Sequence, residues 1–537
     1  MLVLLPALVH SFYLPGVAPR DYKKGEPVPV LVNALTAKDS LLPYDYYHPG
    51  FSFCTPDKEI SQHESLGSIL FGDRLYNSPI ELPALENQTC KVICRKSIQD
   101  TSVDFLMKRI DEEYLVNWVV DGLPAAQLYK DESTSEVFYY PGMPLGLVEG
   151  EQTLLHNHYV IHVHYHKKDA DKIRVVGVIV NPASLDNPKD AEPKCDIAGS
   201  SPVILKTSTQ TEVTYTYTLV WNEDPISWGT RWDHYLHVYD PQIHWFSIVN
   251  AIVIILILAS MVTMILLRAL HKDISRYNTL GDEDGAQDDF GWKMVHADVF
   301  RAPAYRMILC VLLGTGAQLI CMLGVTLAFA VLGFLSPSSR GSLGTMALVF
   351  YILFSVVSGY VSSVMYKTYG GENRKQNVLL TAVLVPGIVF GILIALNFIL
   401  IAKESSSAVP FGTFLALIGL WFLVSIPLCI AGSYFGFRHP GFEPPCKTNQ
   451  IPRQIPPQDY LWVWKSFNAS AASGFYMFVY SIVFLAGKLD LKDAASVVIY
   501  LTWSLVMSIM LAIFTGTVGH LASLYFVRTI YKSIKID

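Results

Sequence analysis

The chain has 537 residues, a net charge of −6 at pH 7 and 51% hydrophobic residues. Its mean hydropathy of +0.34 is high for a globular chain of this size, and the excess lies in the C-terminal half. Because the basic residues are scattered, the basic face expected of a nucleic-acid-binding protein is missing, and nucleic acid is excluded as an expected partner.

The N-terminus begins with a short apolar stretch, MLVLLPALV. We expect residues 1–11 to be a short signal peptide, with a buried first strand as the alternative. The polar residues 12–243 that follow are expected to form a lumenal or extracellular domain.

Four of the eight cysteines lie in this N-terminal region: Cys54, Cys90, Cys94 and Cys195. An oxidising compartment would allow them to form two disulfides, and the sequence leaves all three pairings open. The sequon Asn87-Gln88-Thr89 suits the same compartment, which makes Asn87 a candidate for glycosylation.

Alternation of apolar and polar residues dominates the same region. It is clearest over residues 213–221 and 159–165, and it predicts half-buried strands. Regular proline and glycine punctuation separates such runs. The sequence therefore predicts an all-β domain with an antiparallel, sandwich-like arrangement.

The second of these strands carries an unusual set of histidines, His156, His158, His162, His164 and His166. Their even numbering places them on one face of a regular strand. Imidazoles so spaced suit copper or zinc, or gain charge together as pH falls toward ~6. We favour a solvated polar face instead, because no cysteine or carboxylate nearby completes a typical metal-ligand set.

Apolar runs long enough to cross a hydrocarbon core of ~30 Å as helices fill the rest of the chain. We predict seven spans, at residues 245–267, 308–334, 345–365, 378–402, 413–437, 469–487 and 497–526. Residues 244–527 are therefore expected to form an α-helical polytopic membrane bundle, with the lipid bilayer as its surroundings.

The basic residues predict the orientation of this bundle. They gather in loops 268–306, 366–377 and 438–468 and in the tail 528–537, and the other connections hold only Arg340, Lys403, Lys488 and Lys492. By the positive-inside rule these loops and the tail are cytosolic. The N-terminal domain is then lumenal.

Ionisable groups are nearly absent from the span interiors. This argues against an ion-coupled transporter or a pump, which usually need such groups. His520 is the exception, and we expect it to hydrogen-bond a neighbouring side chain. Pro386 and Pro427 predict kinks, where freed carbonyl groups need partners.

Glycine pairs recur along three of the spans: Gly387 with Gly391, Gly432 with Gly436, and Gly516 with Gly519. Such pairs let helix backbones approach closely, so each pair is a candidate face for another protein's helix. Packing inside the bundle is the favoured interpretation for any single pair. No nucleophile elbow, P-loop, HExxH or dinucleotide motif occurs, so neither an enzymatic activity nor a cofactor is expected.

Several stretches resemble the nonaspanins, also called the transmembrane 9 superfamily or endomembrane protein 70 family. They include FYLPGVAPRDYKKGEPVPVLVNALT, LPYDYYHPGFSFC, GDRLYNSP, RWDHYL, GWKMVHADVFR, TNQIPRQIP and FVRTIYKSIKID. The resemblance implies a multi-pass glycoprotein of Golgi and endosome membranes, with a lumenal domain ahead of nine spans. It also implies help in the sorting, trafficking and surface delivery of other membrane proteins, and a link to adhesion.

Two family features carry over to particular residues. Lys535, Ile536 and Asp537 match the family's cytosolic KxD signal, which implies binding to the COPI coat. The family is also said to recognise cargo with glycine-rich transmembrane helices, and the three glycine pairs are the surfaces that this implies.

One departure from the family pattern lies after TNQIPRQIP. The family has two further spans there, whereas here Gln458 directly precedes Asp459. We expect that a helical hairpin is missing, and losing two spans preserves the orientation of everything downstream. Exon skipping or a mistaken gene model is preferred to a functional short form.

Two other classes of membrane protein share this layout of spans. Seven spans also describe a G-protein-coupled receptor, but the long first cytosolic loop, with an acidic run at residues 282–289, fits that class poorly. A membrane transporter or channel, for copper or another ion, is the second hypothesis.

Overall fold

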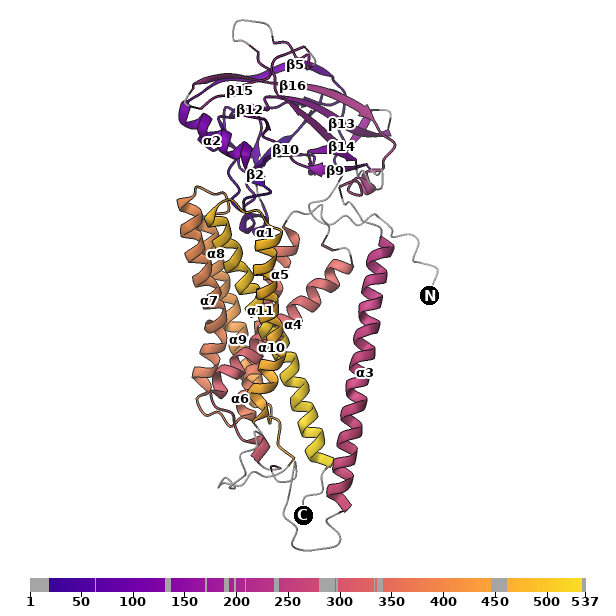
Figure 1. Cartoon of the computed structure of the whole chain (residues 1–537), viewed down its shortest axis with the longest axis vertical. Coiled ribbons are helices and arrows are strands. Elements are labelled where there is room, and N and C mark those ends of the chain that lie inside the picture. The colour runs from indigo at the N-terminus through magenta and orange to yellow at the C-terminus, as the bar shows by residue number, and fades with distance from the viewer. Residues whose placement is uncertain are drawn as a thin grey trace.

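The computed structural model describes residues 19–62, 64–130, 137–169, 171–187, 193–197, 199–207, 209–235, 241–279, 295, 298–332, 334–335, 341–445 and 461–533. A β-rich N-terminal domain lies at one end of a helical bundle (Figure 1). The predicted fold class is confirmed. The signal peptide, the acidic run at 282–289, the junction of Gln458 with Asp459, and Lys535, Ile536 and Asp537 lie outside the described residues.

The larger sheet of the N-terminal domain has six strands. Their order is β5 (Gln88–Ile98), β16 (Thr211–Glu223), β13 (His158–Asp169), β14 (Lys172–Ala183), β8 (Ala126–Lys130) and β9 (Val137–Pro141). The pairing of β13 with β16 is parallel, as is that of β14 with β8, whereas the other neighbours are antiparallel. Most neighbours in the sheet are therefore antiparallel, as predicted, with two parallel pairings that the sequence did not indicate.

A second sheet contains β10 (Met143–Pro144), β6 (Tyr114–Val120), β2 (Val30–Ala37) and β3 (Tyr76–Asn77), with β7 (Leu123–Pro124) paired to β6. Smaller sheets join β1 (Pro27–Val28) to β4 (Leu82–Pro83), and β11 (Gly146–Glu149) through β12 (Gln152–Leu155) to β15 (Ile204–Leu205). The two main sheets share one core, in which Trp118 of β6 contacts Tyr159 of β13 with ring centroids 4.7 Å apart. This is the expected sandwich-like packing.

Short helices complete the domain. In α2 (Asp100–Asp111) the buried residues Val103, Leu106 and Ile110 recur at helical spacing, so one face of the helix packs on the core. α1 (Leu66–Leu70) projects from the domain toward the bundle, where it packs against α5 (Ser342–Leu353) (Figure 1).

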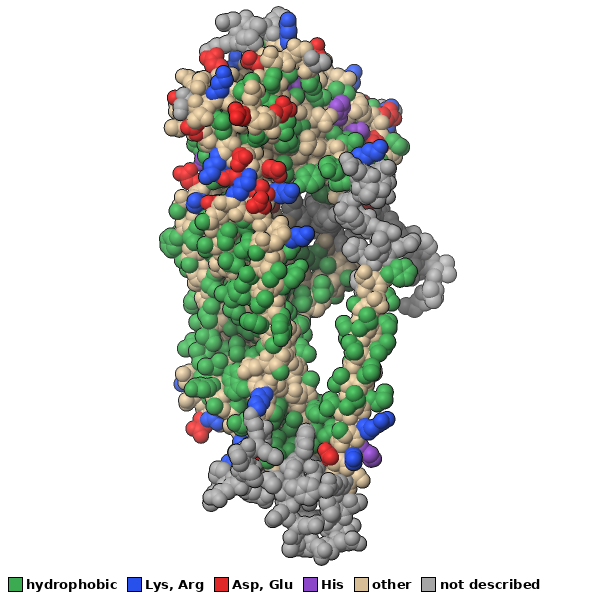
Figure 2. Space-filling model, in the orientation of Figure 1, with side chains coloured by type: hydrophobic (Ala, Val, Ile, Leu, Met, Phe, Trp, Pro, Cys, Tyr) green, Lys and Arg blue, Asp and Glu red, His purple; other side chains and the backbone are tan. Residues whose placement is uncertain are grey.

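Seven helical segments among the described residues are long and apolar enough to cross a membrane, and each overlaps one predicted span. They are α3 (Pro241–Thr279), α4 (Arg306–Val331), α5 continued by α6 (Ser355–Thr368), α7 (Arg374–Ala402), α8 (Phe411–Leu420) continued by α9 (Ile426–Arg438), α10 (Trp462–Gly487) and α11 (Ala494–Ser533). α3 stands apart from the others over its apolar length, which is exposed, and only its end packs against α11, where Leu270 and Ile274 meet Ile530 and Tyr531 (Figures 1 and 2).

Both predicted proline sites lie where the helices depart from regular hydrogen bonding. Pro386 removes the bond to the carbonyl of Ala382, and the indole N–H of Trp421 donates to that carbonyl at 3.2 Å instead. A π-helical turn at Trp421–Ser425 precedes Pro427, and the Ser355 hydroxyl donates to the carbonyl of Ser425 at 3.0 Å. At Pro386 the expected need for a replacement donor is therefore met by a neighbouring helix.

Candidate functional site

The four cysteines of the N-terminal domain form two disulfides. Cys54 is joined to Cys94 and Cys90 to Cys195, with Cα atoms 5.8 and 5.5 Å apart. The sequence left three pairings open, and the structure selects this one. Asn87 lies on the surface just before β5, and its side-chain oxygen accepts a hydrogen bond from the Trp221 amide at 2.9 Å.

The histidines of β13 do not converge on one point. His158 is buried and its Nδ1 lies 2.8 Å from the Thr216 hydroxyl, whereas His162 lies 3.4 Å from the Asn222 amide. Beyond them the strand bulges between His164 and Tyr165.

The last two histidines of the strand both turn toward Asp224. His164 lies 3.1 Å from its carboxylate, and His166 lies 3.4 Å from its backbone carbonyl. Among the described residues, no three His, Cys, Asp or Glu side chains are grouped so that they would hold a metal ion.

Burial also opposes charging of these side chains. It lowers the pKa of His158 to about 4, and it lowers the pKa of His156, whose ring also lies 2.9 Å from the Pro144 carbonyl. Burial, helped by the nearby His164, lowers the pKa of His162 as well. These three side chains therefore resist protonation near pH ~6, which argues against the alternative that the histidines gain charge together.

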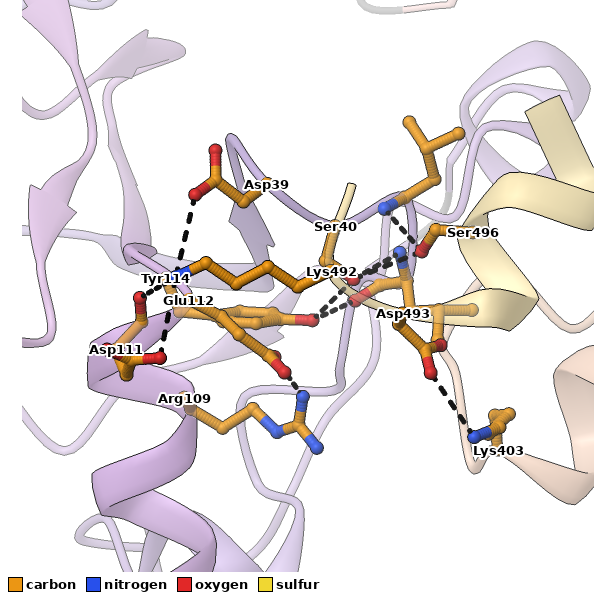
Figure 3. A network of polar contacts seen from close by, with 12 residues as sticks. Asp39, Ser40, Arg109, Asp111, Glu112, Tyr114, Lys403, Lys492, Asp493 and Ser496 are labelled. Carbon is orange, nitrogen blue, oxygen red and sulfur yellow. Dashed lines mark hydrogen bonds and ion pairs between the residues drawn. The ribbon is translucent and has the colours of Figure 1, made fainter. Parts of the chain in front are cut away.

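Charged side chains gather where the N-terminal domain meets the bundle (Figure 2). Lys492, just before α11, donates to the Asp111 carbonyl at 2.9 Å, and its ammonium lies 3.9 Å from the Asp39 carboxylate. Nearby, Lys403 lies 3.6 Å from Asp493 (Figure 3). From the sequence, these lysines were assigned a role only in membrane orientation, because residues so distant along the chain offer no local pairing signal.

Buried hydroxyl groups continue this junction toward the interior. The hydroxyls of Ser40 and Ser496 lie 3.4 Å apart, and Ser496 also accepts a hydrogen bond from the Leu41 amide at 3.1 Å (Figure 3). Tyr114 donates to the Leu42 carbonyl at 2.7 Å. The first turn of α11 is therefore bonded directly to the loop that follows β2.

A second set of contacts joins the domain to the loop between α7 and α8. His48 lies 2.9 Å from the Glu404 carboxylate, Ser405 donates to the Pro43 carbonyl at 2.8 Å, and Arg74 donates to the Ala408 carbonyl at 3.0 Å. Together these contacts fix the domain on the ends of several different helices.

Two of the three glycine pairs are occupied by the bundle's own helices. A Cβ atom on Gly432 would lie 1.9 Å from the Val356 carbonyl oxygen, and one on Gly436 would lie 2.6 Å from that of Tyr360, so α9 touches α6 backbone to backbone. The second of these faces is filled by side chains. A Cβ atom on Gly519 of α11 would lie 1.7 Å from the Ser470 hydroxyl oxygen of α10, and one on Gly516 would lie 2.8 Å from the Phe467 ring.

The third pair is open. Nothing lies within 4 Å of a Cβ placed on Gly391, and one on Gly387 would make only ordinary contacts, of which the shortest is 3.6 Å to Trp421. Ala395, one turn further along α7, is also exposed. Gly387, Gly391 and Ala395 therefore form a stripe of small residues, called here the α7 stripe, in which the described chain leaves Gly391 open and sets the Trp421 ring beside Gly387.

Inside the bundle, neutral polar groups take the place of charges. Ser362 of α6 bonds Thr381 at 2.8 Å and Asn377 at 3.2 Å, both on α7, and all three residues are buried. The expectation that His520 bonds a neighbour is confirmed, since its Nε2 lies 2.9 Å from the Tyr369 hydroxyl. Its ring also stacks on Trp462 with centroids 5.7 Å apart.

Comparison with known proteins shows similarity along the whole chain. A family model described as endomembrane protein 70 matches residues 43–461. Transmembrane 9 superfamily member 9 of Arabidopsis thaliana is 37% identical over 630 positions, which cover 100% of this chain and 98% of the relative. No solved structure matches.

Similar relatives occur in fungi and animals. Transmembrane 9 superfamily member 1 of Saccharomyces cerevisiae is 36% identical over 661 positions, and member 4 of Homo sapiens is 34% identical over 632, each covering 100% of this chain and 98% of the relative. These alignments are longer than the 537 residues of the chain, so the relatives contain residues that have no counterpart here.

Proposed function

This chain belongs to the transmembrane 9 superfamily, the endomembrane protein 70 family, and on that premise we propose that it sorts other membrane proteins in Golgi and endosome membranes. In this proposal the N-terminal domain is lumenal and the C-terminus is cytosolic. The protein assists trafficking and surface delivery of cargo that has glycine-rich transmembrane helices, with effects on adhesion. Glycosylation at Asn87, which is exposed, belongs to the same proposal.

The α7 stripe is the observation that supports cargo binding most directly. Helices associate in lipid mainly through close packing and interhelical hydrogen bonds, and small residues allow the closest approach of two backbones. The other two glycine pairs already receive α6 and α10. Only Gly387 and Gly391 are left, among the three pairs, to receive a glycine-rich helix from another protein.

The C-terminal residues Lys535, Ile536 and Asp537 are the proposed signal for the COPI coat. The placement of α11 supports this role, because the helix extends to Ser533 at the end of the bundle remote from the N-terminal domain (Figure 1). A basic side chain followed by an acidic C-terminal residue is the kind of short signal that a receptor reads.

Localisation of tagged full-length protein tests the signal. Wild type is expected in the Golgi, and the double variant Lys535→Ala, Asp537→Ala is expected to escape to later compartments. A matched control, Lys532→Ala, removes a charge from the last turn of α11 without touching the signal. Unchanged Golgi residence of the double variant would refute the role given to the tail.

Deletion of the gene separates sorting from transport. Sorting predicts that cargo with glycine-rich spans is misrouted while ion flux through reconstituted vesicles stays at background. Flux of copper or another ion through vesicles that contain the purified protein would instead favour the transporter or channel.

We further propose that a two-span hairpin is missing between Gln458 and Asp459. The extra positions in the alignments with relatives support this, as do the seven candidate spans of a chain whose relatives are named for nine. Sequencing transcripts across this junction tests it. A transcript that encodes the two extra spans would show that the short chain arises from exon skipping or from a mistaken gene model.

A further inference from the structure

A small pocket lies at the end of the bundle remote from the N-terminal domain. Its volume is about 50 Å³, and it is lined by the turn before α4, the end of α6, the loop after α9, the start of α10 and the end of α11. The lining residues that matter here are Arg301, Thr368, Phe442, Trp462, Val463 and Arg528. None of the groups proposed above for cargo or coat binding lies in it.

The start of α10 adds partial positive charge to the wall of this pocket. Trp462 and Val463 are the first two residues of this 26-residue helix, and its N-cap residue, Leu461, makes no side-chain cap bond. The first backbone N–H groups of a helix have no partner within it, and they carry the positive end of the helix dipole. A long uncapped helix that begins at a pocket favours a bound anion.

Arg528 adds a full positive charge to the same wall. Its guanidinium donates to the Glu443 carbonyl at 3.0 Å and lies 5.1 Å from the centre of the Phe442 ring, so it is held in place. Its Nε atom is buried and has no hydrogen-bond partner among the described residues. A buried N–H of a charged group without a partner is costly, and a bound acceptor would remove that cost.

Other charged groups at the pocket do not neutralise the positive charge of Arg528. Arg301 also lines the wall, and it is paired with the buried carboxylate of Asp298 at 2.5 Å. Arg306, just outside, donates to the carbonyl of Tyr369 at 3.1 Å. The acid nearest in sequence to the lining loop, Glu443, has an exposed side chain and contributes its carbonyl to Arg528.

We propose that this pocket binds the phosphate group of an anionic phospholipid headgroup. In the orientation proposed above it lies at the cytosolic edge of the bilayer, where such headgroups are concentrated. Its volume suits a single phosphate, and the aromatic rings of Phe442 and Trp462 suit the boundary between headgroups and acyl chains. Arginine and helix N-termini are common phosphate ligands in proteins.

A bound headgroup would join the base of the C-terminal tail to the rest of the bundle. Arg528 lies near the end of α11, whereas Thr368 and Trp462 belong to α6 and α10. The phosphate would bridge these helices through groups that are otherwise separated by the pocket. Lipid composition would then influence how firmly the segment that carries the tail is held.

Native mass spectrometry of the purified full-length protein tests the proposal. The probes are phosphatidylinositol 4-phosphate, phosphatidylcholine and inorganic phosphate, added at matched concentrations. We expect retention of the phosphoinositide at least about tenfold above phosphatidylcholine, and loss of that preference in Arg528→Gln, because a charge-assisted hydrogen bond is removed. The control Arg438→Gln changes a cation that contacts Tyr434, outside the pocket, and should bind as wild type does.

Two results would overturn the proposal: equal retention of both lipids by wild type, or an equal loss in the Arg528 and Arg438 variants. Displacement of the lipid by inorganic phosphate at similar concentration would assign the site to soluble phosphate and reject the lipid. If Arg528→Gln does not fold, thermal stabilisation of wild type decides instead. Selective stabilisation by the phosphoinositide is expected, and equal stabilisation by phosphatidylcholine rejects the site. Both readouts are independent of cargo sorting and of Golgi localisation.

Discussion

The N-terminal domain and the membrane bundle use different interactions to hold their parts together. In the N-terminal domain, two disulfides, an aromatic core and the buried pair of Arg231 with Asp121, whose charged groups lie 2.9 Å apart, connect distant segments. In the bundle, glycine faces and neutral hydroxyl groups connect the helices. Lipid tails are as apolar as leucine, so close backbone contact replaces the hydrophobic effect as the source of specificity there.

This difference makes an unused glycine face informative. A glycine in a transmembrane helix gives up side-chain packing, and two of the three glycine pairs recover it: Gly432 and Gly436 against the backbone of α6, and Gly516 and Gly519 against side chains of α10. In the α7 stripe, a Cβ on Gly391 would meet nothing within 4 Å in the described chain, and one on Gly387 would meet only the Trp421 ring from another helix. The comparison therefore separates glycines that stabilise the fold from glycines that remain available to a partner.

The largest effect is expected from breaking a covalent link in the N-terminal domain. Replacing Cys90 and Cys195 by serine opens a loop with a sequence separation of 105 residues. The expected loss is about 4 kcal/mol of unfolding free energy, because the unfolded chain gains freedom. Hydrogen exchange of β5 and β16 in the full-length protein measures it, and exchange as slow as in wild type would show that the core alone holds these strands.

The second largest effect is expected from placing a large side chain in a filled glycine face of the bundle. Gly432→Leu places a side chain where the Val356 carbonyl already lies 1.9 Å from a Cβ position, so α9 and α6 must separate. We expect a loss of about 3 kcal/mol, seen as a lower Tm in detergent. Gly391→Leu is the matched variant on the open face and should leave the Tm within error. If both variants unfold alike, the distinction between the faces is wrong.

Acid is expected to weaken the N-terminal domain. The pKa of His158 is about 4 in the folded protein and about 6.5 when exposed, so the unfolded state binds more protons between these values. Its contribution is therefore complete above pH ~6.5 and declines as pH falls toward ~4, by about 2 kcal/mol between pH 7 and 5.

The variant His158→Gln isolates this contribution from other titrating groups. Its stability should change less than that of wild type between pH 7 and 5, as followed by hydrogen exchange in β13. An identical pH dependence in the two proteins would show that protonation of His158 is not coupled to unfolding.

The smallest effect is expected at the junction between the two regions. Lys492→Ala removes contacts to Asp39 and Asp111, but the lysine side chain is 41% exposed, so solvent screens the pair. We expect a change of about 0.5 kcal/mol, which disappears in high salt. Detachment of the N-terminal domain in this variant, seen as new protease cleavage near residues 39–42, would mean that the junction depends on this one charge.

Much of the division into a β-rich domain and a helical bundle was predictable from local sequence patterns. Apolar runs predicted the seven helices, alternation predicted β13 and β16, and the proline positions predicted where carbonyls need new donors. These features depend on neighbours in sequence. The parallel pairing of β13 with β16, the disulfide pairing and the contacts of Lys492 depend on segments that are far apart in the chain, so no local pattern encodes them.

The glycine pairs show the same limit at the candidate site. Spacing marked Gly387 with Gly391 and Gly432 with Gly436 as equivalent, because both pairs lie one turn apart. Only the packing of the helices shows that Val356 fills the second pair and that nothing lies against Gly391. The histidines of β13 differ in burial for a similar reason. His158 is buried because β16 pairs beside it, and no local pattern predicts that pairing.

Crosslinking in nanodiscs tests directly whether the α7 stripe receives a helix from another protein, as we propose. A cargo protein with one glycine-rich transmembrane helix, which carries a photoreactive residue, is combined with wild type, Gly391→Leu or Gly487→Leu. Gly487, at the end of α10, is also open, but Val483 and Phe484 lie one turn before it, so it forms no small-residue stripe. We predict that crosslinking falls about tenfold in Gly391→Leu only, because the two backbones no longer approach closely. Equal crosslinking in all three proteins would contradict the claim.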